Sequence, residues 1–432
     1  MVFFSTSRPT KSLTALFAAW KAFLLAIALG AAVGPDYDTS TSLFFERLYG
    51  SRAHVPALAA RLTRWDALFF MHHARNGYVY EQEWAFGAAM PTVVRGILAL
   101  FPSWGRDANT TVEPLVAIAV AHVSHLIAVL ALYRLTMVMS NDTKLAFVTS
   151  ALHIISPAGL FLSAPYAESP FACLSFIGNL LFALGIRNKR DEVKRFALIV
   201  GAGAAFGLAT AFRSNGLSSG VLFAVGAVNC FLAFARGPSL SRLLTLAAPV
   251  IGGICVAAGS VVPQYAAWRR YCGASLHDVE PRPWCSHTMP SIYTFVQDEY
   301  WNVGFLRYWT LNQLPLFLFA SPMLTILLKS GFDMARDPQR ELRLLKSGPL
   351  EDYRMFVRAL AAGQLLVAVL AITTYHVQIV SRLSSGYPVW YWWVAGCLMD
   401  KRRQGWGLTM AVFMAMYAGI QGGLFATFLP PA

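Results

Sequence analysis

The amino-acid sequence predicts an all-α membrane protein with many transmembrane helices, and two observations indicate this fold class. Of the 432 residues, 56% are apolar and only 13% are charged, whereas soluble domains carry about 25% charged residues. Long apolar runs recur along the whole chain, and each has about the 20 residues that a helix needs to cross a bilayer core. The runs are continuous rather than alternating, which excludes a transmembrane β-barrel.

The first apolar run covers residues 13–33 and follows Arg8 and Lys11. It is too long for the core of a signal peptide and ends without a clear cleavage site, so we expect a retained signal anchor. Further runs follow without an internal repeat, which predicts about eleven transmembrane helices in one integral-membrane domain, residues 1–432. The expected spans lie near residues 13–33, 113–139, 144–163, 169–186, 196–212, 216–234, 243–265, 311–328, 356–374, 385–399 and 405–428.

Two long segments, residues 35–111 and 266–307, separate apolar runs, and alternating crossings place both on one side of the membrane. The loops on the other side hold most of the basic residues, so the positive-inside rule makes those loops cytoplasmic. The two long segments are therefore expected to be luminal loops, with the chain termini on opposite sides. The basic residues in question are Arg8, Lys11, Lys144, Arg187, Lys189, Arg190, Lys194, Arg195, Arg236, Arg242, Arg336, Arg340, Arg343, Lys346, Arg354, Lys401, Arg402 and Arg403.

Several classes of partner are not expected. The net charge of +13 does not indicate nucleic-acid binding, because the basic residues cluster in short loops between apolar runs, as membrane orientation requires. No Walker loop and no Cys/His spacing typical of a metal site occurs in the sequence. The adjacent His72 and His73 would point apart on a helix, so they do not predict a shared metal ion.

Six cysteines are present, and four of them lie in apolar runs. Cys272 and Cys285 share one polar loop; they either pair in an oxidising lumen or remain free thiols, and the sequence leaves both readings open. The sequon at Asn109 is a glycosylation candidate if that loop is luminal, whereas the sequon at Asn141 falls on the cytoplasmic side.

Asp66 follows Arg64 and Trp65 and begins an apolar, aromatic stretch in the first luminal segment. One interpretation is a simple helix N-cap. The functional interpretation is stronger, because a carboxylate on an apolar stretch at a membrane surface is costly unless it has a partner or a task. Glycosyl transfer requires a base that takes a proton from the acceptor hydroxyl, and Asp66 is the candidate.

Two further acids are candidates for contact with a substrate. Glu81 directly follows Tyr80 in a Gly-Tyr-Val-Tyr-Glu segment, where it either orients an acceptor hydroxyl or is a solvated loop acid. Glu168 follows Pro165 at the luminal edge of a span, where it is either functional, paired with an arginine, or a first-turn helix acid.

Three polar groups complete the candidate site. Arg213 and Asn215 lie between two spans, where the planar guanidinium suits a phosphate; an arginine that snorkels from a span end is the alternative. His376, with Gln378 and Arg382, forms a luminal polar group at another span end. The segment that begins at Gln297 is rich in aromatic and polar residues, so it is either an interfacial belt or an acceptor-binding loop.

These segments together resemble one known family, the second mannosyltransferases of glycosylphosphatidylinositol (GPI) anchor assembly in the endoplasmic reticulum. They are spread over most of the chain and occur in the order that the family shows. The resembling segments are residues 64–67, 77–81, 156–158, 166–169, 210–216, 297–305 and 376–378. Family members usually read Ala-Phe-Phe-Pro where this chain has Ala85-Phe86-Gly87-Ala88, so the end of this loop departs from the family pattern.

The resemblance implies a GT-C-type fold whose long first luminal loop carries the acid. It implies dolichyl-phosphate-mannose as donor and transfer of the second mannose, in α-1,6 linkage, onto the GPI-anchor precursor at the luminal face. Asp66 is then the base of an inverting displacement, and no metal or other cofactor is expected, because Arg213 can offset the charge of a departing monophosphate. The residues expected to bind substrates are Trp65, Tyr80, Glu81, Glu168, Arg213, Asn215, Gln297 and His376. Among these, Glu81 or Glu168 would orient the acceptor, and Arg213, helped by His376, would contact the phosphate.

Other functional classes remain open from the sequence. A transporter or scramblase of lipid-linked sugars would favour repeated halves and charged residues at mid-membrane, whereas here the polar residues gather at one face. A non-catalytic assembly subunit would depend on no single acid, and another lipid-phosphate-sugar transferase would use the same chemistry. The expected partners are the lipid-linked donor, the GPI-precursor acceptor and the membrane of the endoplasmic reticulum, with a small membrane helper subunit left open.

Overall fold

The computed structural model describes residues 8–104, 110–188, 190–273, 282–341 and 353–429. Within these ranges the regular secondary structure is helical, apart from one isolated bridge between His54 and Thr110. The prediction of an all-α membrane protein is therefore confirmed for the described part of the chain. Asn109 lies outside the described residues.

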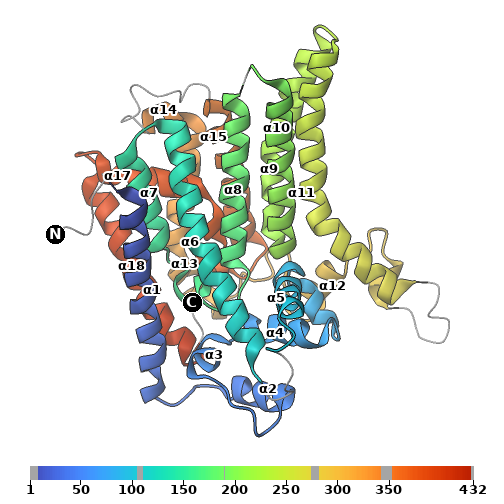
Figure 1. Cartoon of the computed structure of the whole chain (residues 1–432), viewed down its shortest axis with the longest axis vertical. Coiled ribbons are helices and arrows are strands. Elements are labelled where there is room, and N and C mark those ends of the chain that lie inside the picture. The colour runs from blue at the N-terminus through green and yellow to red at the C-terminus, as the bar shows by residue number, and fades with distance from the viewer. Residues whose placement is uncertain (1–7, 105–109, 189, 274–281, 342–352, 430–432) are drawn as a thin grey trace.

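Nine helices in the described ranges, three of them together with an adjoining 3-10 turn, are long and apolar enough to cross a membrane. They pack side by side as a bundle (Figure 1), with most of the apolar core between the helices in its centre. The nine are α1 (Pro9–Gly30), α6 (Val112–Ser140), α8 (Glu168–Arg187), α9 (Glu192–Phe212), α10 (Gly220–Ala235), α11 (Leu240–Cys272), α13 (Leu314–Arg336), α15 (Arg354–Thr373) and α18 (Gln404–Ala426).

The other two expected spans form shorter helices, α7 (Thr143–Ile154) and α17 (Pro388–Met399), of 12 residues each. Such a helix is roughly 18 Å long and does not cross a bilayer by itself. The two helices pack against each other inside the bundle, where the ring of His153 lies 5.2 Å from that of Tyr391. Buried backbone made of short turns follows α7, and a four-residue helix with a 3-10 turn precedes α17; such broken helices are tolerated at membrane depth only where protein surrounds them.

The first long loop folds into short helices at one end of the bundle (Figure 1). These are α2 (Ser40–Tyr49), α3 (Ala57–Leu62), α4 (Asp66–Asn76), the 3-10 turn η2 (Glu81–Ala85) and α5 (Ala89–Leu100). The second long loop contributes η5 (Pro283–Ser286) and α12 (Ile292–Glu299), and α12 packs on η2. A further short helix, α16 (Val380–Leu383), precedes α17.

The basic loops lie at the opposite end of the bundle. The turn between α10 and α11 and the short helix α14 (Pro338–Glu341) both lie there (Figure 1). An ion pair between Arg403 and Glu341 joins the turn between α17 and α18 to α14 at the same end. The loops that the sequence singles out as basic therefore lie together at one end of the molecule.

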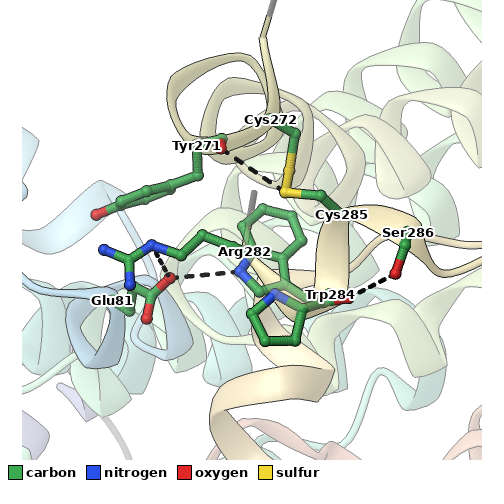
Figure 2. The surroundings of a disulfide bond; sticks show 8 residues. Glu81, Tyr271, Cys272, Arg282, Trp284, Cys285 and Ser286 are labelled. Carbon is green, nitrogen blue, oxygen red and sulfur yellow. Dashed lines mark hydrogen bonds and ion pairs between the residues drawn. A yellow bond between two sulfur atoms is a disulfide. The ribbon is translucent and has the colours of Figure 1, made fainter. Parts of the chain in front are cut away.

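Cys272 and Cys285 form a disulfide, with their Cα atoms 5.6 Å apart. The bond joins the end of α11 to η5 (Figure 2), so it closes the second long loop near the first. The sequence left open whether these cysteines pair or remain free thiols, and in the structure they pair.

Candidate active site

A cavity of about 230 Å³ opens at the end of the bundle that carries the first long loop. Its walls come from segments far apart in the sequence: α4, the residues after η2, the end of α9, α12, and the segment around α16. Five of the residues that the sequence predicts for the site line it, and these are Asp66, Arg213, Asn215, Gln297 and His376.

Asp66 is the first residue of α4 and follows an unusual turn. Trp65 has a φ of 53°, in the left-handed region that non-glycine residues seldom adopt, and its ring packs 4.7 Å from that of Phe428. Asp66 does not act as an N-cap, because Trp65 holds that position and no side-chain cap bond forms. Its carboxylate is 31% exposed and accepts a hydrogen bond of 2.7 Å from Nη2 of Arg382.

Arg382 also binds the second acid of the site. Its Nε donates to Oε1 of Glu168 at 2.6 Å, and Arg213 forms an ion pair with the same carboxylate oxygen. The Glu168 side chain is fully buried. Two arginines and two carboxylates thus form one charge-balanced network in which only Asp66 has substantial exposure.

Aromatic rings hold the Arg382 side chain in place. The guanidinium lies 4.4 Å from the ring centre of Phe161 and 4.9 Å from that of Tyr166, a distance at which cation–π attraction operates. Burial opposes the charge, yet the carboxylates of Glu168 and Asp66 raise the pKa of Arg382 above its ordinary value. Arg382 therefore remains a cation at the wall of the cavity.

Hydrogen bonds fix the orientation of the neighbouring amide. Nε of Arg213 donates to Oδ1 of Asn215 at 3.2 Å, and Nδ2 of Asn215 donates to the hydroxyl of Tyr387 at 3.1 Å. The Tyr387 hydroxyl also contacts Oγ of Ser218 at 2.8 Å. This chain of bonds makes the polar wall around Arg213 rigid before any substrate arrives.

Another part of the cavity lining is aromatic and uncharged. Gln297 from α12 and His376 line it together with Trp301 and Tyr375. Burial lowers the pKa of His376 below its ordinary value, although the Trp301 backbone and the charge of Asp66 partly oppose this shift. His376 is therefore neutral near pH 7 and is able to donate a hydrogen bond without adding charge.

The sequence profile of the family described as Mannosyltransferase (PIG-V) matches residues 16–432 of this chain. The chain belongs to the PIG-V mannosyltransferase family. A relative from Gibberella zeae named GPI mannosyltransferase 2 is 62% identical over 428 residues, which cover 99% of this chain and 98% of the relative. A relative from Cricetulus griseus named GPI alpha-1,6-mannosyltransferase 2 is 31% identical, and the alignment covers 80% of this chain and 75% of the relative.

Among solved structures, the oligosaccharyltransferase of Archaeoglobus fulgidus in the apo form matches with a TM-score of 0.46 and 12% sequence identity. The match covers 96% of this chain and 56% of that chain. The PIG-V family mannosyltransferase described here thus spans about half the length of that archaeal enzyme.

Four predicted site residues of this mannosyltransferase lie outside the cavity lining, and these are Trp65, Tyr80, Glu81 and Glu168. Glu168 lies behind the wall, against the two arginines. Tyr80 is 50% exposed. Their predicted contacts with substrate stay predictions.

Glu81 joins the two long loops of the mannosyltransferase. Its Oε1 accepts a hydrogen bond from Nε1 of Trp284 at 3.4 Å and lies 3.5 Å from Nε of Arg282, close to the disulfide (Figure 2). Its Oε2 accepts a hydrogen bond from the hydroxyl of Tyr300 at 3.2 Å. These contacts differ from those of a solvated loop acid and anchor η2 against the second loop.

Arg382 is the site residue that sequence analysis did not assign. The sequence places it in the same polar group as His376 and Gln378, but nothing local indicates that it binds Asp66, which lies 316 residues away. Within the described residues no group of three or more His, Cys, Asp or Glu side chains is arranged to hold a metal ion.

Proposed function

We propose that this mannosyltransferase transfers mannose from dolichyl-phosphate-mannose to the GPI-anchor precursor, as the second mannose and in α-1,6 linkage. The names of the relatives support the acceptor and, for the Cricetulus griseus relative, the linkage. The observation that carries the chemistry is the juxtaposition of one partly exposed carboxylate, Asp66, with two arginines at a single cavity.

The reaction requires inversion at one carbon, because the donor is a β-linked mannosyl phosphate and the product is an α-mannoside. An acceptor hydroxyl oxygen attacks C1 of the mannose while the bond from C1 to the phosphate oxygen breaks. The hydroxyl proton passes to Asp66, and dolichyl phosphate leaves with the bonding electrons. Asp66 suits the role of base because it lines the cavity, and Arg382 fixes the direction of its carboxylate.

Arg213 and Arg382 offset the negative charge that develops on the leaving phosphate, with His376 as a neutral hydrogen-bond donor. This arrangement requires no metal, since the leaving group is a lipid monophosphate. Asn215 and Gln297 are placed to bind sugar hydroxyls at the cavity wall. Glu168 acts as a positioning residue that holds both arginines.

The remaining predicted residues lie further from the cavity. Trp65 supports the turn that presents Asp66, Tyr80 is assigned to the outer part of the acceptor, and Glu81 orients the acceptor indirectly by holding η2 against the second loop. The cavity faces the lumen of the endoplasmic reticulum in this proposal. Support comes from the disulfide at the same end of the bundle and from the basic loops at the other end.

The test compares cells that lack this chain with cells that carry the unmodified chain, Asp66→Asn or the control Glu46→Gln, an exposed acid of the same loop. Cells without the chain are expected to accumulate a GPI precursor with one mannose. Asp66→Asn should give the same precursor although the protein is present at normal amount, and Glu46→Gln should restore normal anchors. Normal anchors with Asp66→Asn would show that another group is the base, and normal anchors without the chain would overturn the proposed step.

A further inference from the structure

A second hollow, of about 220 Å³, lies at the end of the bundle that carries the basic loops. Residues of α8, α9, α10, α11 and α15 line it, and those of α9, α11 and α15 come from the parts of these helices nearest the basic loops. Its floor is apolar and is built from the buried side chains Phe182, Leu222 and Phe356. Its rim includes Asn229 and Met355, which are exposed.

One cation lies in this otherwise uncharged hollow. Arg195, in the first turn of α9, is the only charged residue among the described residues that line it. Nε of Arg195 is buried and has no hydrogen-bond partner, and Arg195 forms no ion pair within the described part of the chain. No carboxylate of the described residues offsets the charge of this guanidinium, which favours an anionic ligand that pairs with its terminal nitrogens.

We propose that this hollow binds an anionic glycerophospholipid from the cytosol-facing leaflet. The phosphate would lie on Arg195, whose planar donor fork matches phosphate oxygens, and an acyl chain would follow the floor formed by Leu222 and Phe356. Asn229 and Thr245 supply polar groups near the ester region. The surrounding basic loops attract anionic headgroups to the same end of the bundle.

The apolar floor and the cation Arg195 together indicate the class of ligand. A free phosphate ion would leave the apolar floor exposed, and a lipid without a phosphate, such as diacylglycerol, would leave Arg195 without a partner. Because five helices line the hollow, a bound lipid would hold α15 against α8 to α11 and stabilise the folded bundle. The hollow lies at the other end of the molecule from Asp66, so the proposal does not depend on the mechanism of mannosyl transfer.

The experiment measures lipid binding to the purified full-length protein in detergent by native mass spectrometry. Phosphatidylserine and diacylglycerol with identical acyl chains are added separately. We expect phosphatidylserine to bind more tightly, and Arg195→Gln to weaken it by about tenfold while leaving diacylglycerol unchanged. The matched control is Arg236→Gln, an exposed arginine of the neighbouring loop, which should keep the preference.

A second variant tests the apolar floor and covers the case in which Arg195→Gln does not fold. At Gly226, which lines the hollow, an added Cβ would lie 3.4 Å from Cβ of Pro249 and 3.9 Å from the Phe182 ring, which are ordinary contacts. Gly226→Leu should therefore fill the hollow and abolish tight binding of phosphatidylserine while mannosyl transfer persists. Equal binding of the two lipids by the unmodified protein, or unchanged binding by Gly226→Leu, would overturn the proposal. If dolichyl phosphate displaced the bound lipid equally well from the unmodified protein and from Arg195→Gln, the hollow would be assigned to the polyprenyl chain of the donor instead.

Discussion

Arg382 joins Asp66 to Glu168, and these two acids belong to different parts of the chain. The guanidinium uses Nη2 for Asp66 and Nε for Glu168, so its planar shape sets the direction of both carboxylates. A lysine keeps the positive charge but offers one nitrogen, which cannot reproduce both directions. The geometry of the Asp66 carboxylate, the proposed base, therefore depends on the shape of the Arg382 cation as well as on its charge.

We expect Arg382→Lys to lower kcat by roughly 10- to 100-fold, the effect of a misplaced base and a weaker phosphate contact. The folded protein should remain, because the charge balance with Asp66 and Glu168 is kept. Mannosyl transfer by purified protein, together with the melting temperature, checks this. Arg307→Lys is the matched control, since its exposed ion pair with Asp298 lies outside the cavity lining; if both variants kept full activity, Arg382 would have no role in positioning.

At this scale the sequence predicts residue types better than it predicts contacts. Asp66, Arg213 and His376 stand out because charged or titratable groups are rare next to apolar spans, and all three line the cavity. Arg382 and the burial of Glu168 depend on partners hundreds of residues away, which no local pattern shows. Sequence analysis therefore identified Asp66, Arg213 and His376 as site residues but did not assign Arg382, which connects Asp66 to Glu168.

At the scale of elements, the loop after η2 is held against the end of α9 by a close backbone approach. A Cβ on Gly87 would lie 2.0 Å from the carbonyl oxygen of Phe212 and 2.6 Å from that of Ala211. No flexible side chain is available to move aside. This contact places Gly87 directly beside Arg213, in the loop where the chain departs from its family pattern.

Gly87→Ala is expected to push this loop away from α9 and to destabilise the protein by about 1 to 3 kcal/mol, the usual cost of overpacking. Activity should fall as well, because the loop forms part of the cavity wall. The melting temperature and the rate of mannosyl transfer measure the two effects. In Gly96→Ala the added Cβ meets nothing within 4 Å and the residue lies inside α5, so stability should stay equal or rise by up to about 1 kcal/mol. Equal behaviour of the two variants would contradict the role of the close approach.

Helix α4 also carries a buried histidine. The centre of the His73 ring lies 3.7 Å from that of the Tyr78 ring. Burial, followed by the charges of Arg95 and His72, lowers the pKa of His73 to about 4. The unfolded chain, with an ordinary histidine pKa near 6.5, therefore binds a proton at a pH where the folded protein does not.

The sign of the pH effect follows from this difference. The contribution of neutral His73 to the free energy of unfolding is fully present above about pH 6.5. This contribution is lost as the pH falls towards 4, which lowers the free energy of unfolding by at most about 3 kcal/mol. Melting temperatures between pH 7.5 and pH 4.5 should show this loss, and His73→Phe should reduce the slope. The exposed His287 provides the control, because His287→Phe should leave the slope unchanged; a slope that does not depend on His73 would show that other groups titrate.

At the scale of the whole molecule, hydropathy predicted the number of apolar runs but not the length of each helix. The runs that contain α7 and α17 are apolar enough to be read as spans, yet each gives a helix of only 12 residues. The pair Ser156 and Pro157 after α7 is the local signal of the break. Packing decides the path of the chain beyond the break: Gly159 has a φ of 50°, and its backbone lies against Ala418 of α18.

The same end of the bundle carries the disulfide and the cavity, and this arrangement predicts the orientation of the molecule in the membrane. A disulfide forms and persists in an oxidising compartment, and the basic loops at the other end belong to the cytosol by the positive-inside rule. Both arguments predict that Val79, which is 47% exposed in the first loop, faces the lumen and that Arg242 faces the cytosol. In sealed vesicles of endoplasmic reticulum, a membrane-impermeant maleimide should label Arg242→Cys directly and Val79→Cys only after permeabilisation. Labelling of the unmodified chain measures the background from its own free thiols. Direct labelling of Val79→Cys, with labelling of Arg242→Cys only after permeabilisation, would place Asp66 on the cytosolic face.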